Sequence, residues 1–263
     1  MDVRNKSLAM FVVILALVFC SGPLAHAERG GDGPGTGTVM GQIGIKDVGP
    51  MMGGTIFFYD SASGPAPSSA KYWRVPTHSF RVDTNSRFTA KIPEGTYYIG
   101  AIERKSGESL GPPQEGDYFF IGRDKNGKPK ELTVWSNSVV DLQMLSGAEP
   151  FTRATLAQKG ITAIQGVLRD DYGQPMEGML VFAYGTPEMF DRPLFVSERS
   201  DKNGKYLLRV AGGGRYYLKA RADSGGGPSS FMGVYKDGAP LAVKKGRTRR
   251  GANITVFKVG MMQ

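Results

Sequence analysis

Short runs of alternating apolar and polar residues follow one another along most of this chain, and glycine, proline, asparagine or aspartate separates them. A period of two residues predicts strands with one buried face. The predicted strands lie at 39–45, 55–59, 80–82, 88–92, 96–102, 118–121, 132–135 and 139–144, and then at 162–168, 180–184, 195–199, 206–210, 216–220, 231–235 and 254–259. Only 151–158 has a composition that suits a helix, so the pattern predicts an all-β chain.

One sequence pattern occurs twice. Each copy has a turn that begins with aspartate, an alternating strand, a glycine turn and a pair of tyrosines. The copies are Val82–Phe88, Glu94-Gly95 and Tyr97-Tyr98 in the first half, and Ser200–Tyr206, Gly212–Gly214 and Tyr216-Tyr217 in the second. Asp83 and Asp201 are expected to accept backbone N–H groups within their turns, and Gly204 is expected to supply a left-handed conformation. Two tandem antiparallel β-sandwich domains are the simplest interpretation.

Further motifs surround the second copy. They are Gly166-Val167-Leu168, Asp171–Val181, Ser200–Tyr206 and Gly213–Leu218. Over residues 161–259 this pattern resembles the carboxypeptidase regulatory-like domain. The resemblance implies an Ig-like or transthyretin-like (prealbumin-like) β-sandwich and a binding or architectural role, because the peptidase of the family name is a separate domain. The first copy is looser, with Asp47-Val48-Gly49-Pro50 where the family has a longer aspartate-to-proline turn.

The N-terminus predicts export. Arg4 and Lys6 precede the apolar stretch Leu8–Phe19, and Ala25-His26-Ala27 has the form of a cleavage site, so 1–27 is predicted to be a signal peptide. Residues 28–37 are a glycine-rich flexible leader, 38–146 the first β-sandwich domain, 147–160 a linker and 161–260 the second domain. The protein is expected in the periplasm, associated with the outer envelope, or outside the cell.

Cleavage after Ala27 changes the available chemistry. It removes Cys20 and His26, which leaves no cysteine and one histidine, His78. Disulfides, cysteine nucleophiles, iron–sulfur clusters, thiolate zinc sites and covalent haem are thereby excluded. The turn at Asp201 begins like a calcium loop but lacks the later acidic ligands of an EF-hand. We therefore expect no catalytic residue, no metal and no cofactor, and hence no enzyme.

Net charge suggests an anionic partner. The whole chain carries +9, of which the signal peptide contributes +1 through Arg4, Lys6 and Asp2, so the mature part carries +8. Five cations fall within one stretch, the basic segment: Lys244, Lys245, Arg247, Arg249 and Arg250. In an exported protein the partner would be a protein, a polysaccharide or another anionic component of the cell envelope, rather than nucleic acid. A solvated loop is the structural alternative.

Aromatic residues offer a second candidate surface. Consecutive side chains of a strand point to opposite faces, so one ring of each tyrosine pair is expected in the core and the other on the surface. The candidates for stacking on a sugar ring or a protein are Trp73, Trp135, Tyr98 and Tyr217. The sequence therefore predicts a non-catalytic exported scaffold or adhesion-like binding protein. A carbohydrate-binding protein that uses exposed tyrosine and tryptophan is the alternative.

Overall fold

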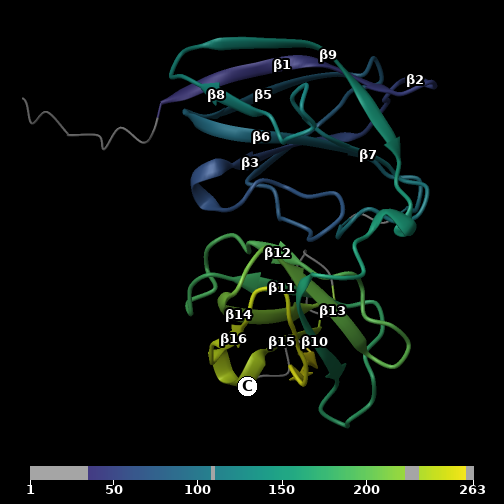
Figure 1. Cartoon of the computed structure of the whole chain (residues 1–263), viewed down its shortest axis with the longest axis vertical. Helices are drawn as coiled ribbons and strands as arrows, with labels where there is room; N and C mark the ends of the chain where they lie inside the picture. Colours follow the sequence, from purple (N-terminus) through teal and green to yellow (C-terminus); the bar gives the residue numbers. More distant parts are fainter. Residues whose placement is uncertain (1–34, 108–109, 223–230, 259–263) are drawn as a thin grey trace, which may run out of the picture. The chain divides into compact units, whose positions relative to one another are not determined.

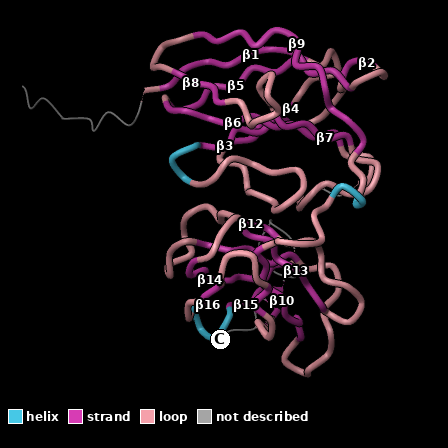
Figure 2. Tube along the Cα trace, in the orientation of Figure 1, coloured by secondary structure: helices cyan, strands magenta, loops and turns pink. Residues whose placement is uncertain are grey.

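The computed structural model describes residues 35–107, 110–222 and 231–258 (Figure 1). The predicted signal peptide and residues 28–34 of the predicted leader lie outside this part of the chain. Residues from Pro34 onward form one compact unit. Strands dominate it, and the described helical turns are short 3-10 turns, η1 (Ser61–Ser63), η2 (Arg153–Thr155) and η3 (Tyr235–Gly238), as Figure 2 shows. The all-β prediction is confirmed.

The first half forms two facing layers of strands. The strands are β1 (Thr36–Ile45), β2 (Gly49–Pro50), β3 (Thr55–Asp60), β4 (His78–Arg81), β5 (Arg87–Pro93), β6 (Gly95–Glu103), β7 (Tyr118–Ile121), β8 (Glu131–Val134) and β9 (Val139–Pro150). In one layer β1 pairs with β2, β5 and β9, and in the other β6 pairs with β3, β7 and β8. The end of β9 also pairs with β7 and so joins the layers along one side.

Two details of this half differ from the sequence prediction. Strands β1 and β9 lie side by side and run parallel, because almost the whole first half separates them and serves as the long crossover that a parallel pair requires. Strand β1 also begins inside the predicted leader. Gly37 lies so close to Trp135 that an added Cβ would be 2.5 Å from the tryptophan carbonyl oxygen, so the glycine here allows close packing rather than flexibility.

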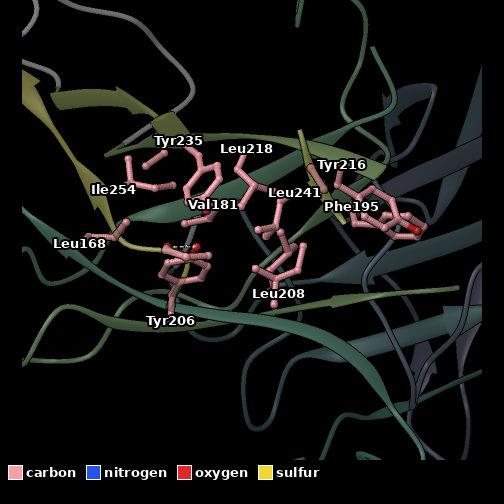
Figure 3. Close-up of a cluster of buried hydrophobic side chains, with 14 of the residues drawn as sticks. Leu168, Val181, Phe195, Tyr206, Leu208, Tyr216, Leu218, Tyr235, Leu241 and Ile254 are labelled. Atoms are coloured by element: carbon pink, nitrogen blue, oxygen red, sulfur yellow. Dashed lines mark hydrogen bonds between the residues drawn. The ribbon is translucent and has the colours of Figure 1, made fainter. Parts of the chain in front are cut away.

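The second half is a separate pair of sheets. Its strands are β10 (Thr162–Arg169), β11 (Leu180–Tyr184), β12 (Phe195–Val196), β13 (Lys205–Val210), β14 (Gly214–Arg221), β15 (Phe231–Val234), β16 (Leu241–Val243), β17 (Thr248–Arg249), β18 (Ile254–Thr255) and β19 (Phe257–Lys258). One sheet has the order β13-β10-β17, and the other has the order β12-β11-β14-β15-β19. Alternate residues of both sheets point inward, and Figure 3 shows Leu208, Leu218 and Phe195 converging in the core between them.

The segment between the halves is less helical than its composition suggests. Strand β9 continues to Pro150, so the first residues of the predicted linker belong to a strand. Residues 151–158 contain only the single turn η2 instead of a helix. A helix this short could form few internal hydrogen bonds, and Phe151 and Leu156 are instead buried against Trp73.

Aspartate-initiated turns recur four times with the same hydrogen bonds. In each, the carboxylate Oδ1 accepts the backbone N–H groups two and four residues later, at 2.7–3.0 Å. These turns begin at Asp83, Asp124, Asp170 and Asp201. The residue three positions on has positive φ in every case, and it is Ser86, Gly127, Gly173 or Gly204. The repeated aspartates and glycines therefore build turns, as the sequence predicted for Asp83 and Asp201.

In each tyrosine pair, one of the two side chains has a structural role. Tyr97 and Tyr216 are buried, and each donates its hydroxyl to the carbonyl oxygen four residues earlier, of Pro93 and Gly212 respectively, at 2.9 Å. Their neighbours Tyr98 and Tyr217 are half-buried on the opposite faces of β6 and β14. The predicted division of each pair between core and surface is confirmed. In both copies the buried tyrosine ties its strand to the preceding turn.

A segment of the first half completes a sheet of the second. The backbone N–H of Val75 donates to the carbonyl of Leu194, and that of Val196 donates to the carbonyl of Trp73, both at 3.0 Å. These bonds form an isolated antiparallel β-bridge between Arg74 and Phe195 at the edge of β12. A small apolar cluster, formed by Trp73, Phe151, Leu156, Leu180 and Val196, packs beside it. The two sandwiches are thus joined by backbone pairing as well as by side chains.

Candidate functional site

The backbone of the basic segment is fixed at several points. After β16 the chain turns at Lys244–Arg247, where the Arg247 N–H donates to the Lys244 carbonyl at 3.1 Å. The Gly246 N–H donates to Thr162 Oγ1 at 2.9 Å, and β17 then pairs in parallel with β10. The predicted loop therefore contains a two-residue strand. Because the main chain is held, its side chains project from a defined edge of the sheet.

The five cationic side chains of the basic segment are all exposed. The ion pairs found among the described residues involve other cations, namely Lys46, Arg104, Lys105 and Arg153. Lys244, Lys245, Arg247, Arg249 and Arg250 thus present positive charge that no carboxylate of the described chain neutralises at close range. Such an arrangement can bind an anionic surface without chemical change to it.

The aromatic candidates do not form one surface. Trp73 is only 5% exposed and makes edge-to-face contacts with Phe119 and Phe151, at centroid distances of 6.0 and 5.4 Å. The prediction that Trp73 contributes to an exposed stacking surface is wrong, because this side chain is part of the cluster that joins the sandwiches. Trp135 is 69% exposed at the end of β8.

The two tyrosine candidates lie on different sheets. Tyr98, on β6, donates its hydroxyl to Glu131 Oε1 at 2.7 Å, and this hydrogen bond, together with partial burial, raises the pKa of Tyr98. Tyr217 lies on β14 opposite Tyr184. The row of aligned rings that a sugar chain would need is therefore not formed by the four candidates.

Two carboxylates of the first half, Asp117 and Glu115, hold loops together. Asp117 is fully buried and accepts the backbone N–H groups of Lys105, Ser106 and Gln114 at 2.7–2.9 Å. Burial raises its pKa, but these donors and the Ser106 hydroxyl outweigh burial, so the pKa of Asp117 lies below its ordinary value. Glu115 accepts the Arg153 N–H at 2.8 Å. Both residues have structural partners.

No group of three or more His, Cys, Asp or Glu side chains in the part of the chain that the structure describes is arranged to hold a metal ion. None of the helices in the described ranges is long and apolar enough to cross a membrane.

The sequence alone did not reveal what holds the turn at Asp124 or where Arg192 lies. The turn at Asp124 and that at Asp170 have the same spacing, Arg-Asp followed by glycine and proline, and in each the arginine donates to the carbonyl of that glycine at 2.7 Å. The spacing is visible in the sequence at Arg123–Pro129, but this turn joins β7 to β8, whereas the turn at Asp170 joins β10 to β11. The two turns therefore occupy different places in their sandwiches. Arg192 lies in a loop without a motif, and only the fold brings it beside the first half.

Comparison with known proteins gives distant similarities. No family model matches the chain, and no curated protein matches it. The Bacillus anthracis TIE protein is 9% identical, with a TM-score of 0.26, over 84% of this chain and 34% of that chain. BcpA, the major pilin subunit of Bacillus cereus, is 11% identical, with a TM-score of 0.26, over 85% of this chain and 99% of that chain.

A streptococcal ancillary pilin is 13% identical, with a TM-score of 0.24, over 84% of this chain. This chain spans 62% of that pilin and 34% of the TIE protein. TM-scores this low mean that the chains do not superpose over their length.

Proposed function

We propose that this protein is an exported, non-catalytic scaffold or adhesion-like component of the cell envelope, and that the basic segment is its contact with an anionic envelope component. The observation that carries the proposal is the exposure of five cations on one anchored edge, without an ion pair to the described carboxylates. Long-range attraction between such an edge and an anionic surface speeds association and weakens with salt.

A role in binding rather than catalysis is supported by how the polar residues are used. The recurrent aspartates accept N–H groups in turns, and Asp117 and Glu115 hold loops in place. The motifs of the second half remain a reason to propose kinship with the carboxypeptidase regulatory-like domain, whose members are generally non-catalytic. The repeated turns at Asp170 and Asp201 fit that proposal.

Export is proposed from the N-terminal sequence. The apolar stretch Leu8–Phe19 and the small residues at Ala25 and Ala27 favour cleavage before Glu28. Intact mass of the protein recovered from the cell envelope or the medium should correspond to a chain that begins at Glu28. A lipid-modified Cys20 at the N-terminus, or retention of the apolar stretch, would contradict the proposed processing.

The binding proposal can be tested with a charge variant. Lys244, Lys245, Arg249 and Arg250 are changed together to Gln, and cosedimentation with the isolated native envelope is measured. We expect the variant to lose most of its binding while its melting temperature stays nearly unchanged, because exposed charges contribute little to folding. A matched control changes four exposed lysines elsewhere, Lys91, Lys125, Lys202 and Lys205, to Gln.

The control separates the effect of charge in the basic segment from the effect of the protein's net charge, because both variants lose four positive charges. Envelope binding should persist in the control if the basic segment is the contact. Equal loss in both variants would indicate that net charge alone drives binding. Undiminished binding by the first variant would reject the basic segment as the contact.

A further inference from the structure

A cavity of about 400 Å³ lies on the outer face of the sheet formed by β3, β6 and β7. On β3, Ile56 and Phe58 point into the core of the first sandwich, so Phe57 and Tyr59 point to the other face by strand alternation. Phe119 and Ile121 of β7 line the same cavity, and Phe182 and Val196 of the second half line it too. The cavity is therefore apolar over much of its wall.

The sequence contains a signal for this second buried face. Ile56-Phe57-Phe58-Tyr59 and Tyr118-Phe119-Phe120-Ile121 are continuous apolar runs rather than alternating ones. Such runs are typical of strands that are covered on both faces. Here the core of the first sandwich covers one face, and the 61–77 segment with the edge of the second sandwich covers the other.

The charged residues of the cavity wall are of one sign. Arg74, Arg104 and Arg192 line it, and no carboxylate does so among the described residues. Arg74 is 7% exposed and donates to the carbonyls of Asp60 and Pro65 and to Ser63 Oγ. Arg104 forms an ion pair with Asp117, with 3.6 Å between Nη1 and Oδ2. These two guanidinium groups are thus held by the protein.

Arg192 differs from the other two arginines. It is exposed, and its guanidinium donates to the Pro76 carbonyl at 3.5 Å, which is long for a hydrogen bond. A second donor of the cavity wall, Trp73 Nε1, is buried and has no hydrogen-bond partner among the described residues. Buried polar atoms are normally satisfied, so an unpaired one beside a cavity is a feature that a ligand would explain.

We propose that this cavity binds a small amphipathic anion, with an apolar body among the aromatic side chains and a carboxylate at Arg192. The volume lies within the range of about 300–1,000 Å³ that is usual for small-molecule sites. Guanidinium and carboxylate groups match in geometry and form paired charge-assisted hydrogen bonds. The three arginines of the wall favour an anion over a neutral or cationic ligand of the same size. This site is separate from the basic segment and does not depend on its role.

Binding in the cavity can be measured through the fluorescence of Trp73. The chain has two tryptophans, so Trp135→Phe leaves Trp73 as the only one, and its emission is excited at a wavelength that tyrosine does not absorb. Trp135 is exposed enough for its replacement to spare the core. This variant is titrated with decanoate, decanol and decylammonium, each below the concentration at which it aggregates. We expect a saturable change in Trp73 emission, with decanoate bound at least about tenfold more tightly than decanol and decylammonium most weakly.

Two arginine variants in the same background test the head-group contact. Arg192→Gln should reduce the affinity for decanoate to that for decanol, whereas Arg215→Gln, an exposed arginine outside the cavity wall, should leave it unchanged. Circular dichroism checks that both variants are folded. Equal affinity for the three amphiphiles, the absence of a saturable signal, or decanoate binding that Arg192→Gln does not weaken would each overturn the proposal.

Discussion

At the residue scale, glycines and aspartates in the turns are explained by backbone geometry. Gly204 and Gly173 occupy the same position of the same kind of turn, with φ of +72° and +81°. Their surroundings differ. An added Cβ at Gly204 would lie 2.2 Å from the Leu168 carbonyl oxygen, whereas nothing lies within 4 Å of one at Gly173. Substitutions at these two glycines can therefore separate the effect of conformational strain on stability from that of a steric clash.

We expect Gly204→Ala to destabilise the protein more than Gly173→Ala. Each substitution puts an L residue into a left-handed conformation, which costs about 1 kcal/mol, and Gly204→Ala adds a clash with backbone that cannot move aside easily. Urea denaturation of the two variants measures the difference in the free energy of unfolding. Equal losses would show that the close approach at Gly204 relaxes without cost.

Asp117 should make the protein sensitive to acid. Its pKa is lowered in the folded state, so its carboxylate stabilises the fold above the pKa of the unfolded chain, about 3.9, and that contribution is lost as the pH falls through the folded-state value. Asp117→Asn should cost about 1–3 kcal/mol at pH 7, because an amide cannot accept from all the donors around it.

The difference in stability between the wild type and Asp117→Asn should therefore shrink between pH 5 and pH 2. Denaturation across that interval measures it. Asp201→Asn is the control, because an asparagine accepts backbone N–H groups in such a turn nearly as well as aspartate does. If the difference in the free energy of unfolding between the wild type and Asp117→Asn does not change with pH, the stabilising role proposed for the carboxylate is wrong.

At the scale of strands, the sequence predicted most elements and little of their pairing. Alternation located β1, β5, β6 and β10 to within a few residues, because one face of each meets a core, and the apolar run at 55–59 located β3. It could not locate β17 or the β-bridge at Trp73–Val75, since a segment of two or three residues is too short to show a period. The parallel pairing of β1 with β9 and the burial of Trp73 depend on contacts between residues far apart in sequence. The exposed basic segment was predictable because charge alone keeps it at the surface.

The β-bridge at Trp73–Val75 should stabilise the second sandwich. Residues 161–258 contain all the fully buried residues of their main core, so we expect this fragment to fold alone. Without the first half it loses the pairing at β12 and exposes Leu180 and Val196, so its melting temperature should be lower than that of the whole chain. Differential scanning calorimetry of both proteins measures the shift, and a fragment as stable as the whole chain would contradict it.

At the scale of the whole molecule, the two sandwiches leave different features on the surface. The second half carries the basic segment on the edge of the β13-β10-β17 sheet. The cavity is lined mainly by the first half, and Arg192 of the second half lies at it. Neither the basic segment nor the cavity includes the aspartates of the repeated motifs, whose carboxylates accept hydrogen bonds within turns. The repeat is thus a framework, and the residues proposed to bind lie outside the repeated pattern.

The most direct test of the central claim is the salt dependence of envelope binding. Between 0.1 and 1 M salt the Debye length falls from about 10 Å to about 3 Å, which screens exposed charges. If the basic segment makes the contact, wild-type binding should weaken steeply over this interval. The variant with Gln at 244, 245, 249 and 250 should bind weakly throughout and respond little to salt. Wild-type binding that is as tight at 1 M as at 0.1 M would contradict the account.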